Sequence, residues 1–192
     1  MSTLFFKFLF KTMGWKVTGI PPKTMRKSIW IVAPHYSNQD FFLGLGVRAT
    51  IGFDIGFLGK KELFTWYSGW LFRALGGHAV NRSQRNNLVE SVSDMFRKAD
   101  DMHIAIAPEG KRKDTDKIKT GFYHMALRAG VPLVLVGINN PEKILMLSAP
   151  LFLSGDYQKD MKIMYDYYLT IPGPKKSWLT NYAKTGLIPP MT

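Results

Sequence analysis

The chain has 192 residues, of which 46% are hydrophobic; this fits one domain with a real core and excludes disorder over most of the sequence. Twenty-six lysines and arginines against 14 acidic residues give a net charge of +12, which favours anionic partners such as nucleic acid, acidic lipid headgroups or phosphorylated substrates. The absence of cysteine excludes disulfides, thiolate metal sites and a thiol nucleophile.

Residues 1–22 are predicted to form an amphipathic helix followed by a linker. Large apolar side chains fill most of positions 3–15. The polar positions recur at helical spacing as one narrow stripe: Thr3, Lys7, Lys11 and Gly14. Such a helix suits a membrane interface, with its aromatic side in lipid, but it also suits packing on the domain or on a partner. Neither a membrane-spanning run nor a secretory signal is expected, so the predicted location is cytoplasmic.

Between residues 23 and 172, strand patterns alternate with helix patterns. Strands are predicted at 29–33, 55–59, 78–80, 103–107, 133–138 and 144–147, and helices at 41–49, 61–75, 88–99, 121–128 and 156–168. This order implies an α/β domain with a largely parallel central sheet and helices on both faces. Residues 173–192 mix proline, lysine and Trp178 and are predicted to form a loose basic tail.

A polar turn with His35 near its start and Asp40 at its end follows the first strand of this domain, where open α/β sheets commonly place ligands. In one interpretation Ser37 caps the next helix and Asp40 returns a hydrogen bond, which is close to a capping box and gives His35 no role. In the other, His35 is a general base whose tautomer and basicity are set by the Asp40 carboxylate. Backbone amides near this turn are candidate oxyanion donors.

Three later segments carry further candidates, and each also has a purely structural explanation. The run from Pro108 to Lys113 is either a solvated turn or an anion-binding loop, in which Gly110 lets the backbone approach and Arg112 grips a phosphate. Arg82, just past a short strand, could be an ordinary surface arginine. Val131-Pro132 opens a buried strand, a position where proline is tolerated.

In this order the four segments resemble the four sequence blocks of the glycerolipid acyltransferase family, which includes the 1-acyl-glycerol-3-phosphate acyltransferases. The matching positions are His35 and Asp40 (His, four residues, Asp), then Arg82, then Pro108, Glu109, Gly110 and Arg112, and finally Val131 and Pro132. Lys60 lies in a stretch that looks like a lysine-bearing segment between the first two blocks. The resemblance covers roughly residues 28 to 140. Pro34, Lys111 and Lys113 depart from the family pattern, and the two lysines could alter the preferred acceptor headgroup.

The resemblance implies an enzyme of phospholipid biosynthesis that moves a fatty acyl group from an acyl thioester, acyl-CoA or acyl carrier protein, to a hydroxyl of a lysophosphatidate-like glycerolipid. An ornithine-type lipid, a lysophospholipid or a glycolipid could be the acceptor instead. The resemblance also implies that His35 and Asp40 are the catalytic residues and that no cofactor is needed. The implied substrate-binding residues are Lys60, Arg82, Glu109, Gly110 and Arg112, where the cations hold the acceptor phosphate and Glu109 orients them or a substrate hydroxyl.

Several alternatives are less well supported by the residues. A Ser37 nucleophile lacks the Gly-x-Ser-x-Gly turn of serine hydrolases. A nucleic-acid-binding module is permitted by the charge, but the basic residues are scattered and match no recognition signature. The four histidines show no ligand spacing, so no metal site is predicted, and His103 and His124 are expected to be structural.

A water-insoluble acceptor requires access to a bilayer. The predicted partners therefore include the cytoplasmic face of an anionic membrane, contacted peripherally. Residues 1–15 would insert there, and Lys175, Lys176 and Trp178 of the tail would add attraction to anionic lipid.

Overall fold

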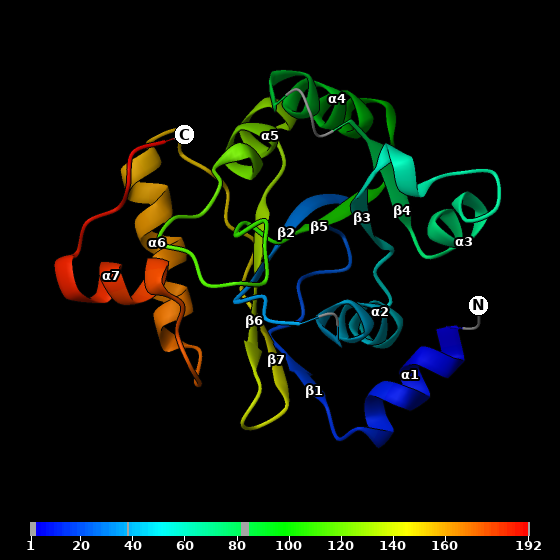
Figure 1. The fold of residues 1–192 in the computed structure, drawn as a ribbon, viewed down its shortest axis with the longest axis horizontal. Helices are drawn as coiled ribbons and strands as arrows, with labels where there is room; N and C mark the ends of the chain where they lie inside the picture. Colours follow the sequence, from blue (N-terminus) through cyan, green and yellow to red (C-terminus); the bar gives the residue numbers. More distant parts are fainter. Residues whose placement is uncertain (1–2, 38, 82–84, 192) are drawn as a thin grey trace.

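The computed structural model describes residues 3–37, 39–81 and 85–191 and shows a central sheet with helices on both faces (Figure 1). The strands are β1 (Lys16–Thr18), β2 (Lys27–Ala33), β3 (Ile55–Lys60), β4 (Gly77–Val80), β5 (Met102–Ile106), β6 (Leu133–Asn139) and β7 (Ile144–Leu147). The helices are α1 (Thr3–Thr12), α2 (Gln39–Ile51), α3 (Gly69–Ala74), α4 (Arg85–Lys98), α5 (Gly121–Ala129), α6 (Tyr157–Thr170) and α7 (Ser177–Thr185), with a short 3₁₀ helix, η1 (Lys61–Leu63).

The sheet has the strand order β1-β7-β6-β2-β5-β3-β4. The neighbours from β6 to β4 are all parallel, and β7 is antiparallel to β6. The predicted α/β class with a largely parallel sheet is therefore confirmed. Because the carboxyl ends of β2, β3, β4 and β5 share one edge, the segments that follow these strands meet there.

Side chains alternate between two cores along the central strands, as the period of a strand requires. Ile29 and Ile31 of β2 pack with α4 to α7 on one face of the sheet, whereas Trp30 packs with α1 and α2 on the other. The same alternation in β6 makes every residue of that strand buried, as predicted. Figure 1 shows α4 to α7 on one side of the sheet and α1 and α2 on the opposite side.

The prediction of one helix over 61–75 is wrong, because residues 64–68 separate η1 from α3. In this interval the Ser68 hydroxyl donates to the Leu63 carbonyl and also contacts the Thr65 hydroxyl at 2.7 Å. Such local side-chain bonds compete with the helical pattern. Residues 16–18, predicted as part of the N-terminal helix and linker, instead form β1 and pair with β7.

The prediction of a loose tail after residue 173 is also wrong. Nine residues form α7, and Trp178 is only 2% exposed, with its ring against Tyr165 and Tyr168 of α6. Gly186 ends the helix in the left-handed conformation that favours glycine. A helix this short is marginal alone, so it depends on burial of its apolar face.

The N-terminal helix α1 has one apolar face on the domain and another in solvent. Phe6 and Phe10 are buried, and Gly46 of α2 lets Phe10 approach so closely that a β-carbon there would lie 2.6 Å from the ring. Leu4, Phe5 and Phe8 are exposed, and Leu9 is half-buried. Within the part of the chain that the structure describes, no helix is long and apolar enough to cross a membrane.

Candidate active site

His35 and Asp40, the two residues predicted to act together, are in contact at the carboxyl end of β2. The Nδ1 atom of His35 lies 2.8 Å from Oδ2 of Asp40, which stands in the first turn of α2. The same oxygen accepts the backbone N–H groups of Tyr36 (2.8 Å) and Ser37 (3.0 Å). The turn therefore wraps around the carboxylate, which holds the imidazole in one orientation.

The capping interpretation of this turn is also present in the structure. The Ser37 hydroxyl accepts the N–H of Gln39 at 3.1 Å and lies 3.3 Å from Oδ1 of Asp40, to which it donates. With the Ser37 N–H donating to Asp40, the start of α2 is close to a capping box, in which the Ser37 hydroxyl accepts the N–H of Gln39 instead of that of Asp40. The capping and catalytic interpretations are compatible, because the Asp40 carboxylate both accepts the Ser37 N–H at the start of α2 and contacts the His35 imidazole.

The electrostatics of the turn favour an ionised Asp40. Burial raises the pKa of Asp40, but hydrogen bonds from His35, Ser37 and Tyr36 outweigh burial and hold this pKa below its ordinary value. Burial, with the nearby carboxylates of Glu109 and Asp114, raises the pKa of Tyr36 to about 12. The Tyr36 phenol therefore stays neutral at ordinary pH, and it donates to the Pro174 carbonyl at 2.8 Å.

The loop after β5 supports this turn from inside the protein. The Glu109 side chain has no exposed surface, so this part of the loop is not a solvated turn. Its carboxylate accepts the His35 backbone N–H and the Trp178 indole N–H, each at 3.1 Å, and it forms an ion pair with Lys176. Glu109 thus orients a cation and the histidine backbone, and it presents no surface to a substrate. Gly110 has a φ of +66°, which a glycine adopts without strain.

The prediction that backbone amides of the His35 turn stabilise an oxyanion is not supported by their hydrogen bonds. The N–H of His35 donates to Glu109, and the N–H groups of Tyr36 and Ser37 donate to Asp40. Because these three amides already serve carboxylates, they are unsuited to stabilise a developing oxyanion.

Two of the predicted phosphate-binding cations, Lys60 and Arg112, lie on segments at the same edge of the sheet. Lys60 is the exposed last residue of β3, and β5 lies between β3 and β2 in the sheet. Arg112 is exposed, and its backbone carbonyl accepts the same Lys176 ammonium that binds the His35 carbonyl. The loop that carries Arg112 is thereby fixed next to the His35 turn. Arg82 lies outside the described residues.

Lys176 is the site residue that sequence reasoning did not find. It was interpreted as part of a lysine pair attracted to lipid, yet it is 3% exposed and bound to Glu109 and the His35 carbonyl. In the sequence, Lys176 stands two residues before a tryptophan in a segment with apolar residues at helical spacing. This pattern does not identify its ion-pair partner Glu109, which is 67 positions away.

The other three histidines lie on regular elements: His78 in β4, His103 in β5 and His124 in α5. His103 is buried in β5, with Nδ1 2.7 Å from the Ser28 hydroxyl and its ring against Trp30 and Phe53, which confirms its predicted structural role. Within residues 3–37, 39–81 and 85–191, no three histidine or acidic side chains gather as metal ligands would.

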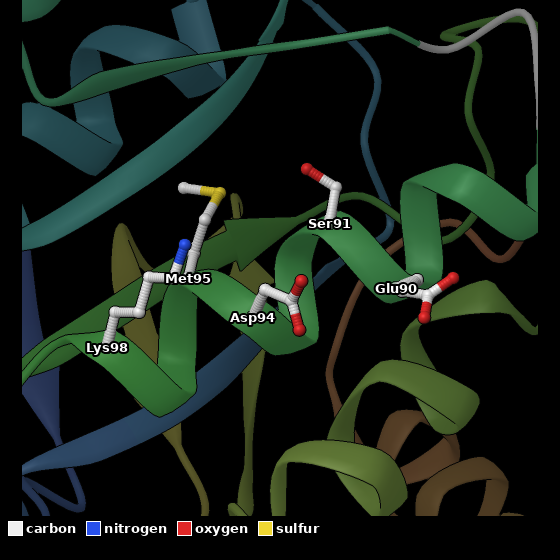
Figure 2. A pocket seen from close by; sticks show the side chains of 5 residues that line it. All are labelled: Glu90, Ser91, Asp94, Met95 and Lys98. Carbon is white, nitrogen blue, oxygen red and sulfur yellow. The ribbon is translucent and has the colours of Figure 1, made fainter.

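Two hollows of the surface do not coincide with the His35 turn. One of about 400 Å³ lies along α4, lined by Glu90, Ser91, Asp94, Met95 and Lys98 (Figure 2). The other, of about 500 Å³, is lined by Arg48, Arg73 and His78 among others. His35 and Asp40 line neither hollow. The candidate site is therefore identified from the contact between these two side chains and not from the hollows.

Comparison with protein families agrees with this location. A family model described as Acyltransferase matches residues 15–139, more than half of the chain. The chain belongs to the acyltransferase family. The matched segment contains His35, Asp40, Glu109 and Arg112 of this acyltransferase, whereas Lys176 and α7 lie beyond it.

A solved structure resembles this acyltransferase over most of its length. It is the crystal structure of the 1-acyl-sn-glycerophosphate (LPA) acyltransferase PlsC from Thermotoga maritima, with a TM-score of 0.61 and 20% sequence identity, covering 90% of this chain and 80% of that chain. A comparison with curated protein sequences gives no match. The fold is thus that of PlsC, and the predicted resemblance to glycerolipid acyltransferases is confirmed at the level of the family.

Proposed function

We propose that this acyltransferase moves a fatty acyl group from an acyl thioester to a hydroxyl of a lysophosphatidate-like glycerolipid, with His35 as general base. The observation that carries the proposal is the 2.8 Å contact between His35 Nδ1 and Asp40. Next to an ionised carboxylate, Nδ1 would carry the proton, and Nε2 would be available to accept one. The similarity to PlsC, a 1-acyl-sn-glycerophosphate acyltransferase, supports the choice of acceptor.

In the proposed reaction no covalent intermediate with the protein forms. Nε2 of His35 takes the proton of the acceptor hydroxyl as its oxygen attacks the thioester carbonyl carbon. The carbon–sulfur bond then breaks, and the leaving thiolate recovers the proton from the imidazolium. The ionised Asp40, held by the Tyr36 and Ser37 amides, stabilises the imidazolium between these two proton transfers.

The acceptor phosphate would bind the exposed cations at this edge of the sheet, Arg112 and Lys60. Arginine binds a phosphate through two parallel hydrogen bonds, and lysine adds a point charge. Acyl-CoA and acyl carrier protein are both compatible donors. The other acceptor classes, an ornithine-type lipid, a lysophospholipid or a glycolipid, are distinguished by the test below.

The test is acyl transfer by purified protein. A labelled acyl-CoA and a labelled acyl carrier protein are each incubated with the panel of acceptors, and products are identified by mass. His35→Ala is expected to lower the rate by about 10² to 10⁴ at unchanged fold, and Asp40→Asn to lower it strongly. Ser37→Ala removes a helix-capping hydroxyl but no reacting group, so it should retain most of the transfer. The proposal would be contradicted if product formed only with acceptors that lack a phosphate. It would also be contradicted by a folded but inactive Ser37→Ala protein, or if no product formed at all.

We also propose that the enzyme attaches peripherally to an anionic membrane, at its cytoplasmic face. Leu4, Phe5 and Phe8 project from α1 into solvent beside the exposed Lys7 and Lys11, which is the arrangement of an interfacial helix. A second exposed group, Trp66, Tyr67 and Trp70, lies on the segment from η1 to α3, which packs against β4 at the edge of the sheet (Figure 1). Aromatic side chains of this kind favour the membrane interface.

A further inference from the structure

Lys176, the last residue before α7, carries a buried ammonium group next to the proposed general base. Its Nζ donates to the His35 carbonyl at 2.6 Å and to the Arg112 carbonyl at 3.2 Å, and it forms an ion pair with Glu109. It also lies 3.5 Å from the Lys113 carbonyl and 5.1 Å from the centre of the Tyr36 ring. With 2% of its side chain exposed, this ammonium is bound almost entirely by protein atoms.

The ion pair holds both polar groups of the His35 backbone. Lys176 binds the His35 carbonyl, and Glu109, its ion-pair partner, accepts the His35 N–H. Hydrogen bonds with a charged partner are shorter and stronger than neutral ones. Asp40 independently fixes the imidazole ring, so the backbone and the ring of the same residue are held by separate groups.

Lys176 also joins the two parts of the candidate site. The carbonyls of Arg112 and Lys113 belong to the loop that follows Glu109, and the His35 carbonyl belongs to the turn after β2. One ammonium therefore fixes the proposed base relative to the loop that carries Arg112. A misplacement of about 1 Å between reacting groups can cost about 10²-fold in rate.

We propose that Lys176 is a positioning residue for acyl transfer, holding the His35 turn and the Arg112 loop in their reactive arrangement. The proposal rests on the proposed role of His35 as general base. Burying an ammonium ion is unfavourable unless it is paired and hydrogen-bonded, and an apolar side chain would pack the start of α7 without that cost. The charge is thus better explained by what it holds than by packing of the helix.

Lys175 provides a matched control one residue away. Its Nζ donates to the carbonyls of Tyr168 and Ile171 at the end of α6, and neither of these two hydrogen bonds involves the His35 turn. Lys175→Met and Lys176→Met remove the same charge from the same segment. Only the second change removes a contact to the proposed base.

The experiment compares both variants in acyl transfer, with kcat and KM measured well below the unfolding temperature. Lys176→Met is expected to lower kcat about 10- to 100-fold with little change in the acceptor KM, because the defect is in alignment and not in binding. Lys175→Met is expected to keep the wild-type kcat. A folded Lys176→Met protein with wild-type kcat, or equal losses in both variants, would overturn the proposal.

Hydrogen exchange of the backbone amides at residues 35–37 gives a readout that does not depend on activity. Lys176→Met should lose protection at these amides, and Lys175→Met should retain it. Retained protection in Lys176→Met would overturn the proposal. If the wild-type protein transfers no acyl group, the proposed function fails while the exchange comparison still decides whether Lys176 fixes the turn.

The double variant Glu109→Gln, Lys176→Met covers the case in which the single variant does not fold. It leaves no unpaired buried charge, so it is expected to fold. It lacks the ammonium that binds the His35 and Arg112 carbonyls, so its kcat should remain low. Wild-type kcat in the double variant would overturn the proposal.

Discussion

The two terminal helices show opposite uses of the same kind of sequence. Both α1 and α7 are short and aromatic and carry exposed lysine. Residues 1–15 were predicted to insert into lipid as a helix, and residues 173–192 were predicted to be a loose basic tail with Lys175, Lys176 and Trp178 attracted to lipid. In the structure α1 projects Leu4, Phe5 and Phe8 into solvent, whereas α7 buries Trp178, Leu179 and Tyr182 against α6 and the sheet. The lysine that precedes α7 is buried as well, bound to the loop after β5.

The difference shows that a short run of aromatic and basic residues does not predict what covers its apolar side chains. In α7 the apolar face is covered by the domain, so this helix contributes to stability and holds the candidate site. In α1 one apolar face packs on α2, where Phe10 contacts Gly46, while a second face remains open. Of these two helices, α1 is therefore the one with exposed apolar side chains that a membrane could bind.

The largest effect expected from this comparison is on stability. Trp178→Ala empties a fully packed position and removes the indole N–H from buried Glu109, so it should lower the free energy of unfolding by about 3–5 kcal/mol. Trp66, which is 92% exposed, is the matched control, and Trp66→Ala should change this free energy by less than about 0.5 kcal/mol. Urea unfolding of the two variants measures both values. Similar losses in the two variants would mean that α7 is not part of the core.

Sequence patterns predicted most of the fold because the period of apolar residues is a local property. The β6 run, the α5 helix ended by Gly130 and the alternation of strands and helices all depend on neighbouring residues. The break between η1 and α3 and the docking of α7 depend on specific contacts, such as Ser68 with Leu63 or Trp178 with Tyr165. Residue spacing does not report such contacts.

The second prediction tests the open face of α1. Phe8→Ser should weaken binding to anionic vesicles by about 1.5–3 kcal/mol, roughly tenfold or more, because a phenyl ring is no longer buried in the interface. Phe152→Ser is the control, since Phe152 is 73% exposed, comparable to 68% for Phe8, but lies between β7 and α6. Vesicle sedimentation measures binding for both. Equal weakening by the two changes would show that general surface hydrophobicity, and not α1, determines attachment.

The third prediction concerns the His35 turn, which is held on one side by residues before and within α7 and on the other by Asp40. The folded protein holds the pKa of Asp40 below its unfolded value of about 3.9, so Asp40 stabilises the fold at pH above 4 and loses this contribution as pH falls through the lowered pKa. Asp40→Asn should therefore cost about 1 kcal/mol at pH 7, and the difference from wild type should shrink near pH 3. Urea unfolding at both pH values measures this. A difference that does not change with pH would exclude the carboxylate charge as the cause.

For the candidate site, the sequence predicted what one strand end supplies but not what distant segments bring to it. His35 and Asp40 are five positions apart, so their pairing follows from a single turn. Glu109 was recognised as a member of its block, but its buried position and its pairing with Lys176 depend on how the chain folds after residue 170. From the sequence alone, Lys176 cannot be distinguished from an exposed surface lysine.

The fourth prediction compares Lys7 of α1 with Lys184, the lysine of α7. Lys7 is exposed beside the apolar side chains of α1, so Lys7→Gln should weaken binding to anionic vesicles about fivefold through the loss of one cation near lipid phosphates. Lys184, in the last turn of α7, is exposed as well, and Lys184→Gln should leave vesicle binding unchanged. The Lys7 effect should also disappear in about 1 M salt, where the screening length is about 3 Å. Equal losses of vesicle binding in Lys184→Gln and Lys7→Gln would mean that the net charge of the protein, and not α1, attracts it to lipid. The difference between the two helices would then concern stability alone.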